Sequence, residues 1–163
     1  MEPQQLNNEQ ASPRPNLFAR FVATGFFSGY VPKAPGTAGS AVALLFFFIP
    51  GFSDPITLIP ASVLLFCIGG LTAESMEKHL GQDPSIVTVD EIVGMWVSMW
   101  FIPFTIVNLL LAFIIFRVLD ILKAYPAGII DKKSGGWNIM LDDIIAAVYT
   151  NAVIQIALRL NIF

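Results

Sequence analysis

Hydrophobic and polar positions follow one another along this chain in long blocks. Four stretches carry no charged residue and are dominated by aliphatic and aromatic side chains: residues 34–53, 55–73, 92–116 and 144–158. A straight helix needs about 20 apolar residues to cross a bilayer core of about 30 Å. The four stretches reach that length or fall slightly short of it, so the pattern predicts membrane helices.

Strong helix breakers interrupt two of these stretches. The first ends in "IPGFSDP", and the third carries Pro103 near its middle, where proline removes a backbone donor and breaks a helix. As one straight helix, the third stretch would place Glu91 and Arg117 about 39 Å apart, on opposite membrane faces. A turn near Pro103 returns both to one face. We therefore predict an all-α integral membrane bundle of two helical hairpins and a C-terminal helix.

Charged residues gather in three segments, residues 14–33, 74–91 and 117–143, which hold eight of the nine Lys and Arg residues. The positive-inside rule assigns such segments to the cytoplasm. Residues 1–16 are polar and proline-bearing and lack the basic start and apolar core of a secretory signal, so we expect a disordered tail there. Residues 17–163 are expected to form a single membrane domain with its charged loops on the cytoplasmic side.

Composition supports a membrane protein and excludes some functions. Of 163 residues, 55% are hydrophobic and 13% are charged, with a mean hydropathy of +0.70, whereas about a quarter of a typical globular protein is charged. The net charge of −3 gives no basic field for nucleic-acid binding. One cysteine excludes an internal disulfide and a multi-cysteine metal site. The oligomeric state, a homo-oligomer included, stays open.

Acidic residues stand at the ends of apolar segments in four places: Glu74, the pair Asp90 and Glu91, Asp120, and the pair Asp142 and Asp143. Carboxylates there are costly unless they are paired or bind an ion, and oxygen ligands without a His or Cys cluster favour Mg²⁺. Asp90 and Asp142 are both expected at helix starts, where an Asp is often only a cap. Adjacent helical side chains point about 100° apart, so we expect one carboxylate of each pair to bind and the other to cap or orient.

The segment "FRVLDILK" places Asp120 three residues from both Arg117 and Lys123, so all three are neighbours on one helix surface. One interpretation is a chain of ion pairs along the helix. The other has Asp120 binding a metal while Arg117 or Lys123 holds an anionic oxygen.

The loop "GYVPKAPGTAGS" precedes the first apolar stretch. Lys33 offers a point charge, Gly36 permits close backbone approach, and Thr37 and Ser40 stand at an expected helix N-terminus, which favours anions. These features suit a phosphate group. The alternative is an ordinary interfacial turn that starts a hairpin.

Four blocks together resemble the phosphatidylglycerophosphatase A family in order and spacing, over residues 20 to about 155: "ATGFFSGYVPKAPGTAGS", "DPSIVTVDEIVGMW", "FRVLDILKAYP" and "GGWNIMLDDIIAAV". The resemblance implies an all-α enzyme that removes the terminal phosphate of phosphatidylglycerophosphate with Mg²⁺, giving phosphatidylglycerol at the cytoplasmic face of a bacterial inner membrane. The residues matched to the family pattern are Lys33, Gly36, Thr37, Ser40, Asp90, Glu91, Arg117, Asp120, Lys123, Asp142 and Asp143.

On this basis we expect one or two Mg²⁺ ions at the cytoplasmic interface, direct attack by water, and acyl chains that stay in the bilayer. The candidate metal ligands are Glu91, Asp120, Asp142, Asp143 and Glu74. Lys33, Arg117 and Lys123 are expected to bind phosphate oxygens. Two rival functions are a small cation transporter, which would place its carboxylates in mid-span, and a non-catalytic lipid-binding protein, which an assay of phosphate release separates from an enzyme.

Overall fold

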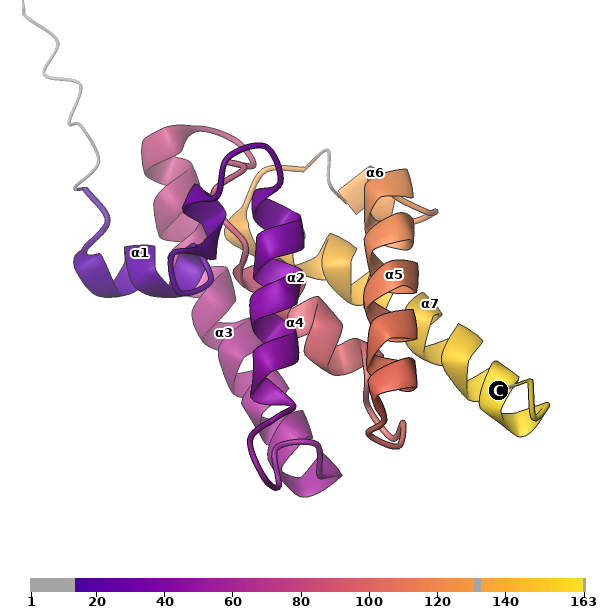
Figure 1. Cartoon of the computed structure of the whole chain (residues 1–163). Helices are drawn as coiled ribbons and strands as arrows, with labels where there is room; N and C mark the ends of the chain where they lie inside the picture. Colours follow the sequence, from indigo (N-terminus) through magenta and orange to yellow (C-terminus); the bar gives the residue numbers. More distant parts are fainter. Residues whose placement is uncertain (1–13, 131–132, 163) are drawn as a thin grey trace, which may run out of the picture.

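The computed structural model describes residues 14–130 and 133–162 and contains helices and no strand over that part of the chain. The helices are α1 (Leu17–Ala23), the short 3₁₀ helix η1 (Ser28–Tyr30), α2 (Pro35–Phe46), α3 (Pro55–Leu80), α4 (Val89–Ser98), α5 (Ile106–Leu122), α6 (Ala127–Ile130) and α7 (Gly136–Arg159) (Figure 1). The all-α prediction is confirmed. Most of the predicted disordered tail, up to residue 13, lies outside the described residues.

Helix α4 forms the centre of the molecule. Every residue of α4 except Glu91 is buried, and α2, α3, α5 and α7 all pack against it. After its acidic first turn the helix reads "IVGMWVS", which is apolar on nearly all sides, as a helix buried all round requires. At ten residues, or about 15 Å, α4 is too short to cross a bilayer.

The chain reverses direction between α4 and α5, around Pro103. Helix α4 ends at Ser98, whose carbonyl accepts a hydrogen bond from the Asn151 side chain of α7 at 3.1 Å. Helix α5 starts after Thr105, whose hydroxyl accepts the Asn108 backbone N–H at 3.1 Å. The reversal brings the start of α4 and the end of α5 to the same end of the molecule.

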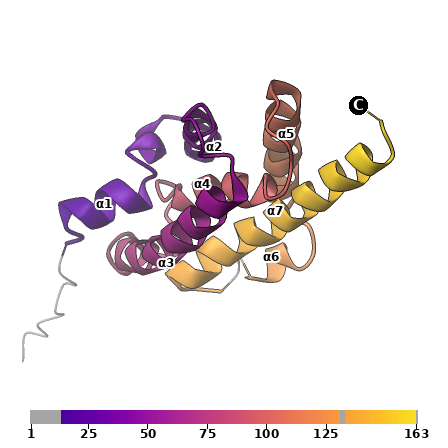
Figure 2. The same cartoon turned by 90° about the horizontal axis from the view of Figure 1, so that it is seen from below.

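Helices α3 and α7, of 26 and 24 residues, are long and apolar enough to cross a membrane by length and composition. They correspond to about 39 and 36 Å. Large apolar side chains point outward from several helices, among them Leu64 on α3, Ile114 on α5 and Ile156 on α7. Helix α7 runs obliquely across the molecule, packed on α3, α4 and α5 (Figure 2).

Candidate active site

A polar pocket of about 420 Å³ lies at the end of the molecule where α2 and α4 start and α5 ends. Its charged lining is Asp83, Asp90, Glu91, Asp120, Asp142 and Asp143 together with Lys33, Arg117 and Lys123. Six carboxylates against three cations leave an excess of negative charge. Of the predicted site residues, all except Glu74 and Ser40 line this pocket, although they come from four separate blocks of sequence.

The first turn of α4 supplies Asp90 and Glu91. This turn is fixed from behind: the Thr88 backbone N–H donates to the Ala23 carbonyl at 2.9 Å, and the Thr88 and Ser28 hydroxyls are 3.1 Å apart. Both hydroxyl residues are buried. The two carboxylates therefore start from a rigid segment, as a preorganised site requires.

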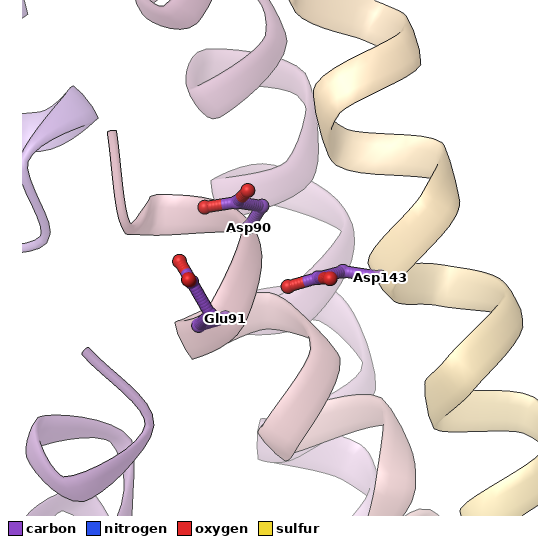
Figure 3. Close-up of side chains that lie close together, drawn as sticks. All are labelled: Asp90, Glu91 and Asp143. Atoms are coloured by element: carbon purple, nitrogen blue, oxygen red, sulfur yellow. The ribbon is translucent and has the colours of Figure 1, made fainter. Parts of the chain in front are cut away.

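Asp143 of α7 completes a cluster with Asp90 and Glu91, and one oxygen of each lies within 4.8 Å of the others (Figure 3). Within the described part of the chain, Asp90 Oδ1, Glu91 Oε2 and Asp143 Oδ2 are buried without a hydrogen-bond partner. Buried polar atoms are normally paired, and opposite oxygen ligands of Mg²⁺ are about 4.2 Å apart. These three carboxylates therefore fit a divalent cation in number, spacing and chemistry.

The shifted pKa values of the two carboxylates in the first turn of α4 also fit a bound cation. Burial raises the pKa of Asp90 well above its usual range, and the negative charges of Glu91 and Asp143 raise it further. Burial also raises the pKa of Glu91, whereas the positive charge of Arg117 acts in the opposite direction. Desolvation and like charge both disfavour the ionised carboxylates, and a bound cation would offset both effects.

Arg117 of α5 lies between two carboxylates. Its Nη1 is 2.7 Å from Asp120 Oδ2 and 3.8 Å from Glu91 Oε1. Gly36 of α2 packs directly over this group: a Cβ there would collide with Glu91 Oε1 and come within 3.0 Å of Arg117 Nη2. The absence of a side chain at Gly36 thus allows α2 to approach the Glu91–Arg117 pair.

Lys123 and Asp142 form a second ion pair across the pocket, with Nζ 3.1 Å from Oδ2. Helix α5 ends at Leu122, and Lys123 takes the left-handed conformation with φ 47°. One interpretation of the sequence is a chain of ion pairs along α5 that includes Asp120 and Lys123. In the structure the Lys123 side chain leaves the surface of α5 and reaches α7. The pair connects α5 to α7 beside the carboxylate cluster.

The loop before α2 brings Lys33 to the rim of the pocket. Lys33 is exposed and has φ 73°, a conformation that is uncommon for a residue other than glycine. Thr37, in the first turn of α2, also lines the pocket. Ser40 does not: it is buried, and its hydroxyl donates to the Gly36 carbonyl at 3.0 Å.

Glu74 lies away from the cluster, at the start of α7. Its Oε2 accepts the Gly136 backbone N–H at 2.8 Å, and Glu77 Oε2 accepts the Gly135 N–H at 2.7 Å. These two carboxylates of α3 cap α7, which begins at Gly136. The prediction that Asp142 stands at a helix start is therefore wrong, because contacts with α3 start the helix six residues earlier.

Two features of the pocket went unpredicted. The hydroxyl pair of Ser28 and Thr88 behind α4 joins residues 60 positions apart, and no local pattern signals it. Ser85 lines the pocket beside Asp83. The signal available for Ser85 is its place in a polar loop directly before the acidic pair of α4.

The pocket lies within the part of the chain that a known protein family matches. The family model of Phosphatidylglycerophosphatase A matches residues 21–158, which include every charged residue of the pocket. No solved structure matches the chain.

Curated relatives match over most of their own length. A Bacteroides thetaiotaomicron protein, named as a candidate phosphatidylinositol-3-phosphatase, is 36% identical over 153 residues, covering 88% of this chain and 96% of that protein. A Phosphatidylglycerophosphatase A of Escherichia coli is 36% identical over 137 residues, covering 82% of this chain and 79% of its own. A Phosphatidylglycerophosphatase A of Haemophilus influenzae is 33% identical and covers 82% and 84%.

Proposed function

The chain belongs to the phosphatidylglycerophosphatase A family, and we propose that it hydrolyses the terminal phosphate of phosphatidylglycerophosphate, giving phosphatidylglycerol and inorganic phosphate. The observation that carries this proposal is the cluster of Asp90, Glu91 and Asp143, with buried unpaired oxygens beside a pocket that three cations also line. Cation-binding carboxylates and basic side chains in one pocket suit a dianionic phosphate. The protein would serve phospholipid biosynthesis.

Asp90, Glu91 and Asp143 are the residues that would hold Mg²⁺. When bound, Mg²⁺ neutralises phosphate charge and lowers the pKa of a coordinated water. This ligand set differs from the one expected from the sequence, which contains Asp120 and Asp142 and omits Asp90. The difference rests on the three buried, unpaired oxygens.

Asp120 and Asp142 would instead position the basic side chains. Asp120 holds Arg117 at 2.7 Å, and Asp142 holds Lys123 at 3.1 Å. Arg117 and Lys123, with Lys33 at the rim, would then bind the non-bridging phosphate oxygens. Preorganised positive charge of this kind stabilises the charge that a phosphoryl group carries in its transition state.

The reaction transfers a phosphoryl group to water. The water oxygen forms a bond to phosphorus in line with the breaking bond to the glycerol oxygen. A pocket carboxylate takes the proton that the water loses and returns a proton to the glycerol oxygen, which leaves as an alcohol. The acyl chains of the lipid would remain in the bilayer beside the apolar helices.

We also propose a membrane topology. Helices α3 and α7 would cross a bacterial inner membrane, with α2–α3 and α4–α5 forming the two hairpins and α7 the C-terminal helix. The end of α3 and the start of α7 meet at Glu74 and Gly136, on the same side as the pocket, so one membrane face would carry the charged loops. The positive-inside rule makes that face cytoplasmic.

The relatives supply a second substrate to test, because the Bacteroides thetaiotaomicron relative is named for phosphatidylinositol 3-phosphate. Purified full-length protein is given either lipid at equal concentration, with Mg²⁺ or with EDTA, and released inorganic phosphate is measured. We expect Mg²⁺-dependent release, faster from phosphatidylglycerophosphate by about tenfold or more, a difference that a few head-group contacts can supply.

Variants identify the pocket responsible. Asp90→Asn should abolish release, whereas Arg159→Gln, at the far end of α7, should not change it. Faster release from the inositol lipid would replace the proposed substrate with that lipid. A folded protein that releases no phosphate from either lipid would identify a non-catalytic lipid-binding protein.

A further inference from the structure

A second cavity, of about 440 Å³, lies beside α1 and is separate from the carboxylate pocket. Its lining includes Arg14, Arg20, Tyr30 and His79, with Met76 and Ile86 among its apolar residues. No carboxylate is among the described residues that line it. The cavity therefore differs in charge from the acidic pocket and suits an anion.

Arg20 is held in place within this cavity. Its Nη2 donates to the Tyr30 hydroxyl at 2.9 Å, and its other N–H groups can bind a further acceptor because arginine has five donors. Arg14 lies just before α1, and His79 stands in the last turn of α3. Paired arginine side chains favour phosphate among anions because the guanidinium binds its oxygens bidentately.

Helix α1 and the segment after it, which contribute to this cavity, also carry exposed apolar side chains. Leu17 is 72% exposed and Phe18 61% exposed on α1, and Phe27 and Val31 are exposed on the segment that follows. Such a group of large apolar side chains marks a membrane or protein contact. Basic residues interleaved with exposed Leu and Phe are typical of segments that lie in a membrane interface.

The orientation of α1 agrees with an interfacial position. Helix α1 runs across the direction of α2: where α2 is seen nearly end-on, α1 is seen from its side (Figure 2). If α2 lies along the membrane normal, α1 lies roughly in the membrane plane. It would then place Leu17 and Phe18 at the acyl boundary and the two arginines at the level of the phosphates.

We propose that α1 and the adjoining cavity form a binding site for an anionic phospholipid that is not the substrate, with its phosphate between Arg14 and Arg20 and its glycerol and acyl region against Leu17 and Phe18. This site rests on the proposed membrane location and not on the proposed catalysis. Anionic lipids attract each basic residue near the surface by an amount that corresponds to about fivefold in affinity.

The site also contacts the carboxylate pocket through one loop. Gly29 packs against the Ile86 carbonyl so closely that a Cβ would collide with it, and Ile86 faces the basic cavity while Ser85 and Val87 face the acidic pocket. A lipid bound at α1 would therefore fix the position of residues 85–87, which line both cavities, relative to the head groups of the membrane.

The test measures lipid binding without turnover. Full-length protein in zwitterionic detergent micelles is titrated with phosphatidylglycerol, with phosphatidylcholine or with inorganic phosphate, and hydrogen exchange of residues 14–31 is followed. We expect protection by phosphatidylglycerol alone. In Arg14→Gln and Arg20→Gln, the midpoint should rise about fivefold for each arginine removed.

The matched control is Arg159→Gln, which removes an arginine at the opposite end of α7 and should leave the midpoint unchanged. Thermal unfolding shows that each variant is folded; if Arg20→Gln fails this check, Arg14→Gln alone decides. Equal protection by phosphatidylcholine, equal protection by inorganic phosphate, or an unchanged midpoint in the folded arginine variants would each overturn the lipid site.

Discussion

Gly36 determines how closely α2 approaches the Glu91 carboxylate and the Arg117 guanidinium. In Gly36→Ala the added methyl would displace one or both groups. Because a misplacement of about 1 Å can cost about a hundredfold in rate, we expect kcat to fall by about that factor. Thermal stability should be kept, since alanine is the better helix former. Phosphate release and thermal unfolding of one preparation measure kcat and thermal stability. A kcat equal to that of the parental protein would show that the close packing at Gly36 is irrelevant to the reaction.

Asp142 and Asp143 are adjacent in sequence but have different surroundings. Asp143 joins the carboxylate cluster, and Asp142 pairs with Lys123. We expect Asp143→Asn to raise the Mg²⁺ concentration that gives half-maximal activity by about tenfold or more. Loss of a residue that only supports a metal ligand already lowers metal affinity by about tenfold. Asp142→Asn should mainly raise KM. Calorimetric Mg²⁺ binding checks the first effect without turnover, and equal shifts in the two variants would contradict the assignment.

At the residue scale, the sequence predicted the membership of the pocket better than the roles within it. The three charged segments identified Lys33, Arg117 and the paired carboxylates because ionisable groups at the ends of apolar segments are costly unless they are paired or bind an ion. It did not predict that Glu91 and Asp90 both face the cluster, since a 100° separation favours one of each pair. The relative positions of α4, α5 and α7 decide this, and no local pattern encodes them.

At the element scale, the start of α7 depends on α3. The Glu74 and Glu77 carboxylates accept the N–H groups of Gly136 and Gly135. We expect Glu74→Ala to lower the free energy of unfolding by about 1–2 kcal/mol, as for loss of a helix cap, with the Mg²⁺ requirement unchanged. Lys78→Ala, which removes an exposed partner of Glu74, should cost less than about 0.5 kcal/mol. Denaturant titration in detergent gives both values, and a raised Mg²⁺ requirement in Glu74→Ala would return Glu74 to the metal ligands.

The element boundaries differ in how well the sequence predicts them. Proline and glycine positions identify the interruptions before α3 and between α4 and α5, because these residues act locally. The sequence predicts the bounds of individual helices less well. Helix α4 stops at Ser98, before Pro103, and the side chain of Asn151 donates a hydrogen bond to the Ser98 carbonyl. Helix α7 starts at Gly136 because α3 caps it. Both boundaries are set by side chains more than 50 residues away along the chain.

At the scale of the whole molecule, polar and apolar regions separate along the direction of α2. The charged pocket occupies one end, where α2, α4 and α7 begin and α3 and α5 finish. Exposed apolar side chains cover the outer surfaces of α3, α5 and α7. A head group can therefore reach the carboxylates while its acyl chains stay beside apolar helices.

This arrangement predicts that the two ends of α7 lie on opposite sides of the membrane. Ser134 precedes the helix and Ile162 follows it, and both are exposed. In a Cys67→Ser background, which removes the single cysteine, Ser134→Cys should react with a membrane-impermeant maleimide in inside-out vesicles and Ile162→Cys in intact spheroplasts. About 36 Å of helix separates them, enough to span the hydrocarbon core. Labelling of both cysteines from one side would show that α7 lies on the bilayer and does not cross it.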